Sequence, residues 1–326
     1  MRSRSKALAL GAVLAGSVGV SAGVGVVWGA FAAQTASNGN EVRSVPDFVA
    51  PQASGSVVQK STGGAPGFVR SGASYRLLAA VADSGRPSSG IASVTGSMTD
   101  GPSGVVLTAG TYAPVAGQTY THRSAVQAVG TAYAGTYTYA LALADAAGNA
   151  RTQTGFSVMV DNTAPVPTGI VATNHTGGIV GHPDPGDTVR WTTSEPLDAI
   201  SLVAGWEGLD TTNVVVRLTN GSSGGNDSLA VYNAANTAAL PLGTVDLGRT
   251  DYTTSSRTFG AGGTPSTLTL TGNDVVLQLG AASGSTTTAG GTGTLRWTPG
   301  PGVTDRAGNA LGTSTFAEPG IADRDF

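Results

Sequence analysis

The chain has 326 residues, with 49 Gly, 16 Pro, no Cys and only 11% charged residues. Its Gly and Pro content lies below that of low-complexity disorder, and 40% apolar residues can form a buried core, which indicates a globular protein of about two domains. The lack of Cys excludes disulfides and Cys-ligated zinc, and a formal net charge of −3 without a basic stripe argues against nucleic-acid binding.

The N-terminus has the layout of a secretory signal. Arg2, Arg4 and Lys6 precede an uncharged run over 7–27, and small residues follow over 29–33. We therefore expect a signal peptide over 1–32, a linker over 33–46 and a secreted or cell-surface protein that leaves the membrane after cleavage. The alternative is a retained membrane anchor, although the many glycines of the run would make poor lipid-facing material.

Residues around the expected cleavage site carry a resemblance. The segment Trp28-Gly29-Ala30-Phe31, followed by Ser37-Asn38-Gly39-Asn40, resembles the start of SipW-type signal-peptide proteins, which include camelysin-like and biofilm-fibre secreted proteins. The resemblance covers about 40 residues and implies export from a Gram-positive-type cell.

Two short motifs each occur twice in the same order. The pattern D-x-x-A-P begins at Asp47 and again at Asp161, and D-x-A-G-N-A begins at Asp145 and again at Asp305. Each copy of the first motif opens a stretch that ends just after the second. The chain is therefore expected to hold two units of one plan, over 47–161 and 162–326.

Between the motifs, apolar residues recur with period two. This alternation is clear over 137–143 and 156–160 in the first unit, and over 189–191, 214–218, 268–270 and 295–297 in the second. Turn residues interrupt the runs, and no helical period follows the signal, which predicts an all-β protein of two tandem antiparallel β-sandwiches. Trp191 and Trp297 share faces with Val189 and Leu295, so both rings are expected in the core. The extra length of the second unit is expected in long loops over 205–265.

Several segments carry a resemblance to bacterial Ig-like domains of secreted and surface proteins. In the first unit these are 82–91, 135–137 and 160–165, and in the second unit 186–191, 194–198 and 303–309 are similar to SbsA-type Ig-like domains. The resemblance implies Ig-like sandwiches but no single function, because such folds host many roles. Tyr137 is placed like a tyrosine corner, early in the penultimate strand.

Acidic residues fall in loops that alternating strand directions bring to one end of each unit. Asp47, Asp83 and Asp145 are expected together at the entry of the first unit. At the junction, the expected set is Asp161, Glu195, Asp198 and Asp305. Clustered carboxylates suit Ca²⁺, which binds 6–8 oxygen ligands, so calcium is expected at the junction and, on weaker grounds, at the first entry. The alternative is that each acid only caps its own turn.

No arrangement of nucleophile, base and orienting acid is recognisable, so no enzyme activity is expected. The favoured function is an exported structural or adhesive module of the cell surface or extracellular matrix, whose partner is a cell-wall or matrix component or another protein. The alternative is a glycan-binding module in which Trp206, expected in a loop, stacks on a sugar ring.

Overall fold

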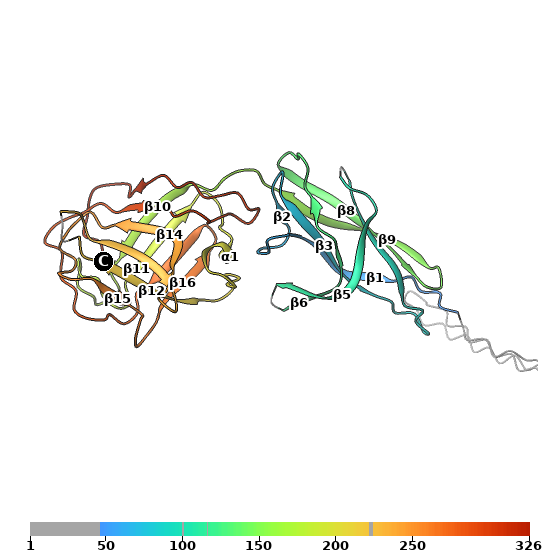
Figure 1. Ribbon diagram of the computed structural model, residues 1–326, viewed down its shortest axis with the longest axis horizontal. Helices are drawn as coiled ribbons and strands as arrows, with labels where there is room; N and C mark the ends of the chain where they lie inside the picture. Colours follow the sequence, from blue (N-terminus) through green and yellow to red (C-terminus); the bar gives the residue numbers. More distant parts are fainter. Residues whose placement is uncertain (1–45, 100, 116, 222–223) are drawn as a thin grey trace, which may run out of the picture. The chain divides into compact units, whose positions relative to one another are not determined.

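The structure is a computed structural model that describes residues 46–326, apart from 100, 116 and 222–223. The predicted signal peptide and all of the linker except Pro46 lie outside the described residues. Strands dominate the described part, and strand pairing divides them into two large sheets that share no strand (Figure 1). The predicted all-β class is confirmed. Within the described residues, the strands pair antiparallel except for β2 and β9, which are parallel.

The first β unit contains nine strands: β1 (Gln52–Lys60), β2 (Phe68–Val69), β3 (Ser74–Ala82), β4 (Ile91–Met98), β5 (Val105–Val115), β6 (Gln118–Ser124), β7 (Gln127–Ala128), β8 (Gly135–Asp145) and β9 (Ala150–Val160). They pair in the order β1-β3-β6-β5-β4-β8-β9-β2, with β7 beside β3. Strand β5 joins two layers, because its first two residues pair with β4 and its later residues pair with β6.

The core of the first β unit lies between these layers. Leu77 of β3 and Leu141 and Leu143 of β8 are at most 2% exposed, while the residues between them on β8 are more exposed, as the period-two pattern predicts. Gly96 of β4 lies so close to Leu77 that a Cβ there would come within 2.2 Å of the leucine Cδ2 atom. The two layers therefore pack closely at this point because Gly96 has no side chain to keep β4 away from Leu77.

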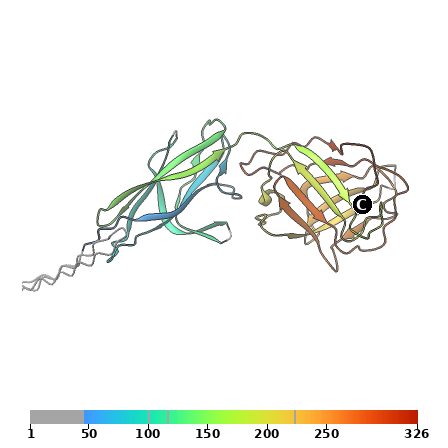
Figure 2. The same ribbon diagram turned by 180° about the vertical axis from the view of Figure 1, so that it is seen from behind.

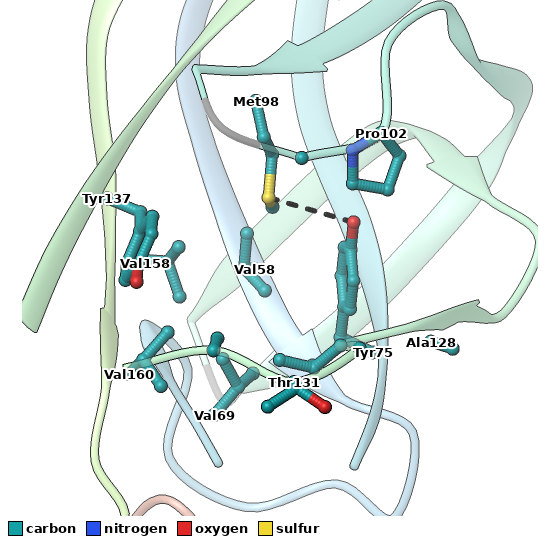
Figure 3. A pocket seen from close by; sticks show the side chains of 14 residues that line it. Val58, Val69, Tyr75, Met98, Pro102, Ala128, Thr131, Tyr137, Val158 and Val160 are labelled. Carbon is teal, nitrogen blue, oxygen red and sulfur yellow. Dashed lines mark hydrogen bonds between the residues drawn. The ribbon is translucent and has the colours of Figure 1, made fainter. Parts of the chain in front are cut away.

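A cavity of about 330 Å³ remains between the layers of the first β unit (Figure 3). Val58, Val69 and Val158 line it with apolar surface, and the Tyr75 hydroxyl donates a hydrogen bond to the Met98 Sδ atom at 3.7 Å. Among the described residues, those that line the cavity carry no carboxylate, imidazole or amine. Burial raises the pKa of Tyr75, which keeps its hydroxyl protonated as a donor.

The second β unit contains α1 (Ala199–Leu202), β10 (Pro167–Thr173), β11 (Thr188–Thr193), β12 (Thr212–Thr219), β13 (Ser228–Asn233), β14 (Ala239–Asp246), β15 (Arg257–Phe259), β16 (Ser266–Thr271), β17 (Asp274–Gln278), β18 (Arg296–Thr298) and β19 (Phe316–Ala317). Its strands pair in the order β10-β11-β17-β16-β12-β13-β14-β18-β19, with β15 beside β12. The first and last strands of this path contact each other, so the sheet curls around one core (Figure 1, and from behind in Figure 2).

The two predicted core tryptophans lie in this second core. Trp191 is 1% exposed and Trp297 is fully buried, and their ring centroids are 6.5 Å apart. Part of the prediction for this unit is wrong. Much of 205–265, expected as long loops, is strand, because β13 and β14 place Leu229, Val231 and Val245 in the core. These strands were not recognised from the sequence because segments rich in glycine and asparagine lie beside them.

Candidate functional site

The repeated D-x-A-G-N motif closes each unit in the same way. In the first unit the Asp145 carboxylate accepts hydrogen bonds from the Asn149 backbone N–H and side-chain Nδ2, both at 2.8 Å. The same Nδ2 atom donates to the main-chain carbonyl of Asp47 at 3.0 Å. The motif therefore does more than form a turn, because its Asn ties the last turn of the unit to the residue where the unit begins.

The second unit repeats this arrangement. Asp305 accepts from the Asn309 backbone N–H and Nδ2 at 2.8 Å each, and Asn309 Nδ2 donates to the Asp161 carbonyl at 3.0 Å. We call each set the entry clamp of its unit: Asp47, Asp145 and Asn149 in the first, and Asp161, Asp305 and Asn309 in the second. The aspartates could be identified from the sequence, but the role of both asparagines could not, although their place in a twice-repeated motif was the available signal.

Three of the four acids predicted at the junction meet at the second entry clamp. One carboxylate oxygen each from Asp161, Glu195 and Asp305 lies within 4.8 Å of the others. Asp305 is 2% exposed and Asp161 and Glu195 are half-buried. Asp161 accepts the Thr163 backbone N–H at 2.9 Å, but the buried Oε1 atom of Glu195 has no hydrogen-bond donor.

The electrostatics of this cluster are unfavourable for Glu195. Burial, then the adjoining Asp161 carboxylate and the charge of Asp305, raise the pKa of Glu195 to about 7. Each contribution disfavours the ionised form, because the carboxylate loses water and gains two like charges. A cation among the three carboxylates would reverse this balance.

The acids predicted at the first entry also meet, but they have more donors. Oxygens of Asp47, Asp83 and Asp145 lie within 4.8 Å of one another. Asp47 accepts from the Val49 N–H and from the N–H and hydroxyl of Ser89, each at 2.9 Å. The Ser88 hydroxyl and neighbouring backbone N–H groups lower the pKa of Asp83. Here hydrogen bonds already stabilise the charged carboxylates without an ion.

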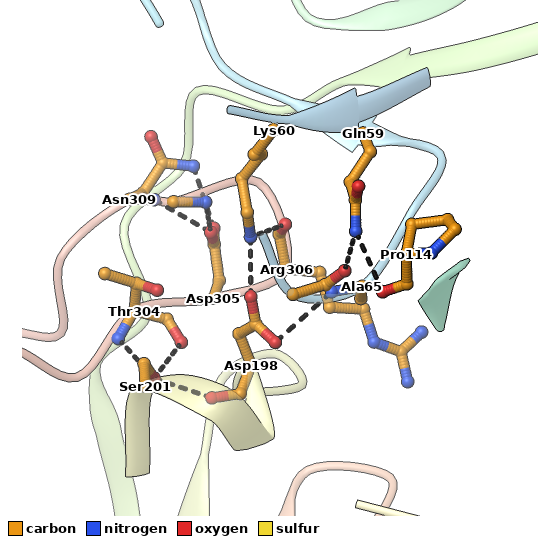
Figure 4. A network of polar contacts seen from close by, with 12 residues as sticks. Gln59, Lys60, Ala65, Pro114, Asp198, Ser201, Thr304, Asp305, Arg306 and Asn309 are labelled. Carbon is orange, nitrogen blue, oxygen red and sulfur yellow. Dashed lines mark hydrogen bonds and ion pairs between the residues drawn. The ribbon is translucent and has the colours of Figure 1, made fainter. Parts of the chain in front are cut away.

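Asp198, the fourth acid predicted as a calcium ligand, is placed differently. Its Oδ2 atom lies 2.6 Å from the Lys60 ammonium, and both side chains are 6% exposed (Figure 4). Lys60 also donates to the Arg306 carbonyl, and the Ala65 backbone N–H approaches Asp198 Oδ1 at 3.4 Å. The expectation for Asp198 is wrong because a lysine already neutralises it, and it is not part of the three-carboxylate cluster.

The placement of Trp206 also corrects the prediction. The side chain is 7% exposed and belongs to the core of the second β unit, and its Nε1 atom donates to the Asp210 carbonyl at 2.7 Å. A buried ring has no free face for a sugar. Gly205, with a φ of 79°, turns the chain just before it and directs the ring inward.

No protein-family model matches the chain, and none of the curated proteins searched matches it. Across the described residues, no helix is long and apolar enough to cross a membrane.

Proposed function

We propose that this chain is an exported, non-enzymatic structural or adhesive module of the cell surface or extracellular matrix, built from two Ig-like β-sandwiches in tandem. The observation that carries the proposal is the entry clamp found in both units. Asn149 is bonded at 3.0 Å to Asp47, which opens the first unit, and Asn309 is bonded at 3.0 Å to Asp161, directly before the second. The same hydrogen bonds fix the point where the chain enters each unit. A tandem protein that presents its loops to a partner needs its units held in this way.

Further support for the Ig-like assignment comes from Tyr137. Its hydroxyl donates to the Tyr133 main-chain carbonyl, four residues upstream, at 3.1 Å. This is the hydrogen bond that a tyrosine corner makes in Ig-like domains. The two-layered first unit, with its core between the layers, has the architecture that such a corner accompanies.

Localisation and partner can be tested together. We expect the native protein in the medium or cell-wall fraction, with an N-terminus between Ala30 and Gln34 by mass spectrometry. Recovery of intact Met1 in the membrane fraction would contradict export with cleavage. In a pull-down on cell-wall polysaccharide, a structural module should stay in the supernatant, whereas specific retention would favour the glycan-binding alternative.

We further propose that the second entry clamp binds Ca²⁺ through Asp161, Glu195 and Asp305. Two ligands on opposite sides of one Ca²⁺ ion are separated by about 4.6–5.2 Å, and the three oxygens lie within 4.8 Å of one another. The unpartnered Oε1 atom of Glu195 supports a ligand at this place, since a buried carboxylate oxygen without a donor is costly. The ion would fix the start of the second unit to its last turn.

Calorimetry with and without a chelator tests this proposal. Calcium at about 100 times its dissociation constant should stabilise the second unit by about 2.7 kcal/mol and raise its melting temperature. Glu195→Gln should remove the part of the calcium response that this site contributes, yet in chelator it should melt no lower than the wild type, because it removes a repulsive charge. Asp210→Asn, which changes an exposed acid elsewhere in the unit, is the matched control. A melting temperature unchanged by millimolar calcium in the wild type would show that these acids only cap turns.

A further inference from the structure

A third group of carboxylates lies outside both entry clamps, near the last strands of the second β unit. One carboxylate oxygen each from Glu318, Asp323 and Asp325 lies within 4.8 Å of the others. The backbone N–H of Glu318 donates to Leu295, and the Asp323 carbonyl accepts from Gly293, each at 2.8 Å. Backbone pairing beside β18 therefore holds two of the three acids at fixed positions.

Asp325 is the unusual member of the group. Its side chain is 1% exposed, and its Oδ1 atom is buried with no hydrogen-bond donor. Its Oδ2 atom has only a long hydrogen bond, 3.5 Å, from the hydroxyl of the fully buried Tyr252. A buried carboxylate with one free oxygen has lost its hydration without replacing it, which is unfavourable unless a ligand compensates it.

The basic side chains that lie near this group make other contacts. The guanidinium of Arg324 donates to the Gly290 carbonyl at 3.3 Å, and that of Arg249 pairs with Asp251 at 2.6 Å. Among residues 46–326, leaving aside the four undescribed positions, no ion pair is found for any of the three carboxylates. The group therefore brings three carboxylates together without an ion pair to any basic side chain of the described residues.

We infer that Glu318, Asp323 and Asp325 bind a hard divalent cation of the calcium class, at a site separate from both entry clamps. The oxygens are near enough for one Ca²⁺ ion to touch all three, and main-chain carbonyls and water supply the remaining ligands that Ca²⁺ requires. The free Oδ1 atom of Asp325 gives the ion a ligand that has no other partner. The inference does not depend on the proposed function.

Binding would attach the segment after β19 to the core. Phe326, next to Asp325, is 1% exposed and packs edge-on against Tyr252 with ring centroids 5.7 Å apart. The ion would bridge the buried Asp325 to Glu318 and to the exposed Asp323. Cation binding and packing of the last residues are therefore coupled, so that each stabilises the other.

Terbium luminescence offers a direct test, because Tb³⁺ replaces Ca²⁺ at oxygen sites and is excited through a nearby tyrosine. In the full-length mature protein, Tb³⁺ should show emission sensitised by Tyr252 that Ca²⁺ displaces. Asp323→Asn removes one ligand from an exposed residue whose side chain makes no hydrogen bond to another described residue, so the fold should survive. We expect this variant to weaken Tb³⁺ and Ca²⁺ affinity at the site at least about tenfold, since ligand charge sets calcium affinity.

Two further variants separate this site from the entry clamp. Tyr252→Phe should lose the tyrosine-sensitised emission while calorimetry still detects Ca²⁺ binding. Glu195→Gln should leave the tyrosine-sensitised emission intact, and Asp210→Asn is the neutral control. The inference is overturned if Asp323→Asn and Asp325→Asn both bind Tb³⁺ and Ca²⁺ as the wild type does, or if the wild type shows neither binding heat nor displaceable emission at millimolar Ca²⁺.

Discussion

Trp297 provides a quantitative test of how the second β unit is packed. The side chain is fully buried in β18, opposite Val245 of β14, and its Nε1 atom donates to the Leu242 carbonyl at 2.6 Å. Trp297→Ala would leave a cavity, which costs about 3–5 kcal/mol for a buried tryptophan. It would also leave the Leu242 carbonyl without its donor, at about 1–3 kcal/mol. Because these costs overlap, we expect the free energy of unfolding to fall by about 5 kcal/mol.

The assay uses the position of the tryptophans. Trp191 and Trp206 lie in the second β unit and the first contains none, so tryptophan fluorescence during urea unfolding of the mature protein reports the second unit alone. Trp297→Phe, which keeps an aromatic ring but loses the N–H donor, should cost about 1–3 kcal/mol and remain measurable if the alanine variant fails to fold. Leu209→Ala, at a side chain 73% exposed, should change stability by less than about 0.5 kcal/mol. A cost below about 1 kcal/mol for Trp297→Ala would refute the packing described here.

Two further predictions concern the first β unit and its lysine. Burial raises the pKa of Tyr139 to about 12, so its contribution to stability is complete below the ordinary tyrosine value of about 10 and is lost as the pH rises through 12. Circular dichroism at rising pH should show an alkaline loss of roughly 2–3 kcal/mol in the wild type and a smaller one in Tyr139→Phe, and identical profiles would be inconsistent with a buried hydroxyl. Lys60→Met should destabilise the protein by about 3–5 kcal/mol, because it leaves Asp198 buried without its ammonium partner. Adding Asp198→Asn should restore part of that loss in a urea titration, and strictly additive effects would show that the two side chains do not interact.

Much of the fold was accessible from the sequence because strands have a simple period. The alternation around Leu141 and around Trp191 identifies which side chains face the core, and the structure buries both. The strands over 228–246 were missed because a glycine-rich segment precedes β13 and the alanine- and asparagine-rich segment 234–238 separates β13 from β14. Such runs resemble loops until long-range pairing with β12 and β18 is known.

Some residues of the candidate site could be predicted from the sequence and others could not. Asp161, Glu195 and Asp305 could be grouped because alternating strand directions bring their loops to one end of the unit, and the structure places their oxygens together. Asp198 could not be separated from them in advance, because its partner, Lys60, lies 138 residues earlier in the chain. No residue near Asp198 in the sequence indicates that the Lys60 ammonium will pair with it.

The entry clamps also determine when each unit can be complete as the chain is synthesised. Asn149 bonds to a residue 102 positions before it, and Asn309 to one 148 positions before it. Contacts of such long range are made late, because a long loop must close before they form. The chain emerges from its N-terminal end, so the segments around Asp47 and Asp161 stay unbonded and accessible to proteases until the last hairpin of their unit has emerged. Truncation just before either Asp-x-Ala-Gly-Asn turn would leave that segment permanently open.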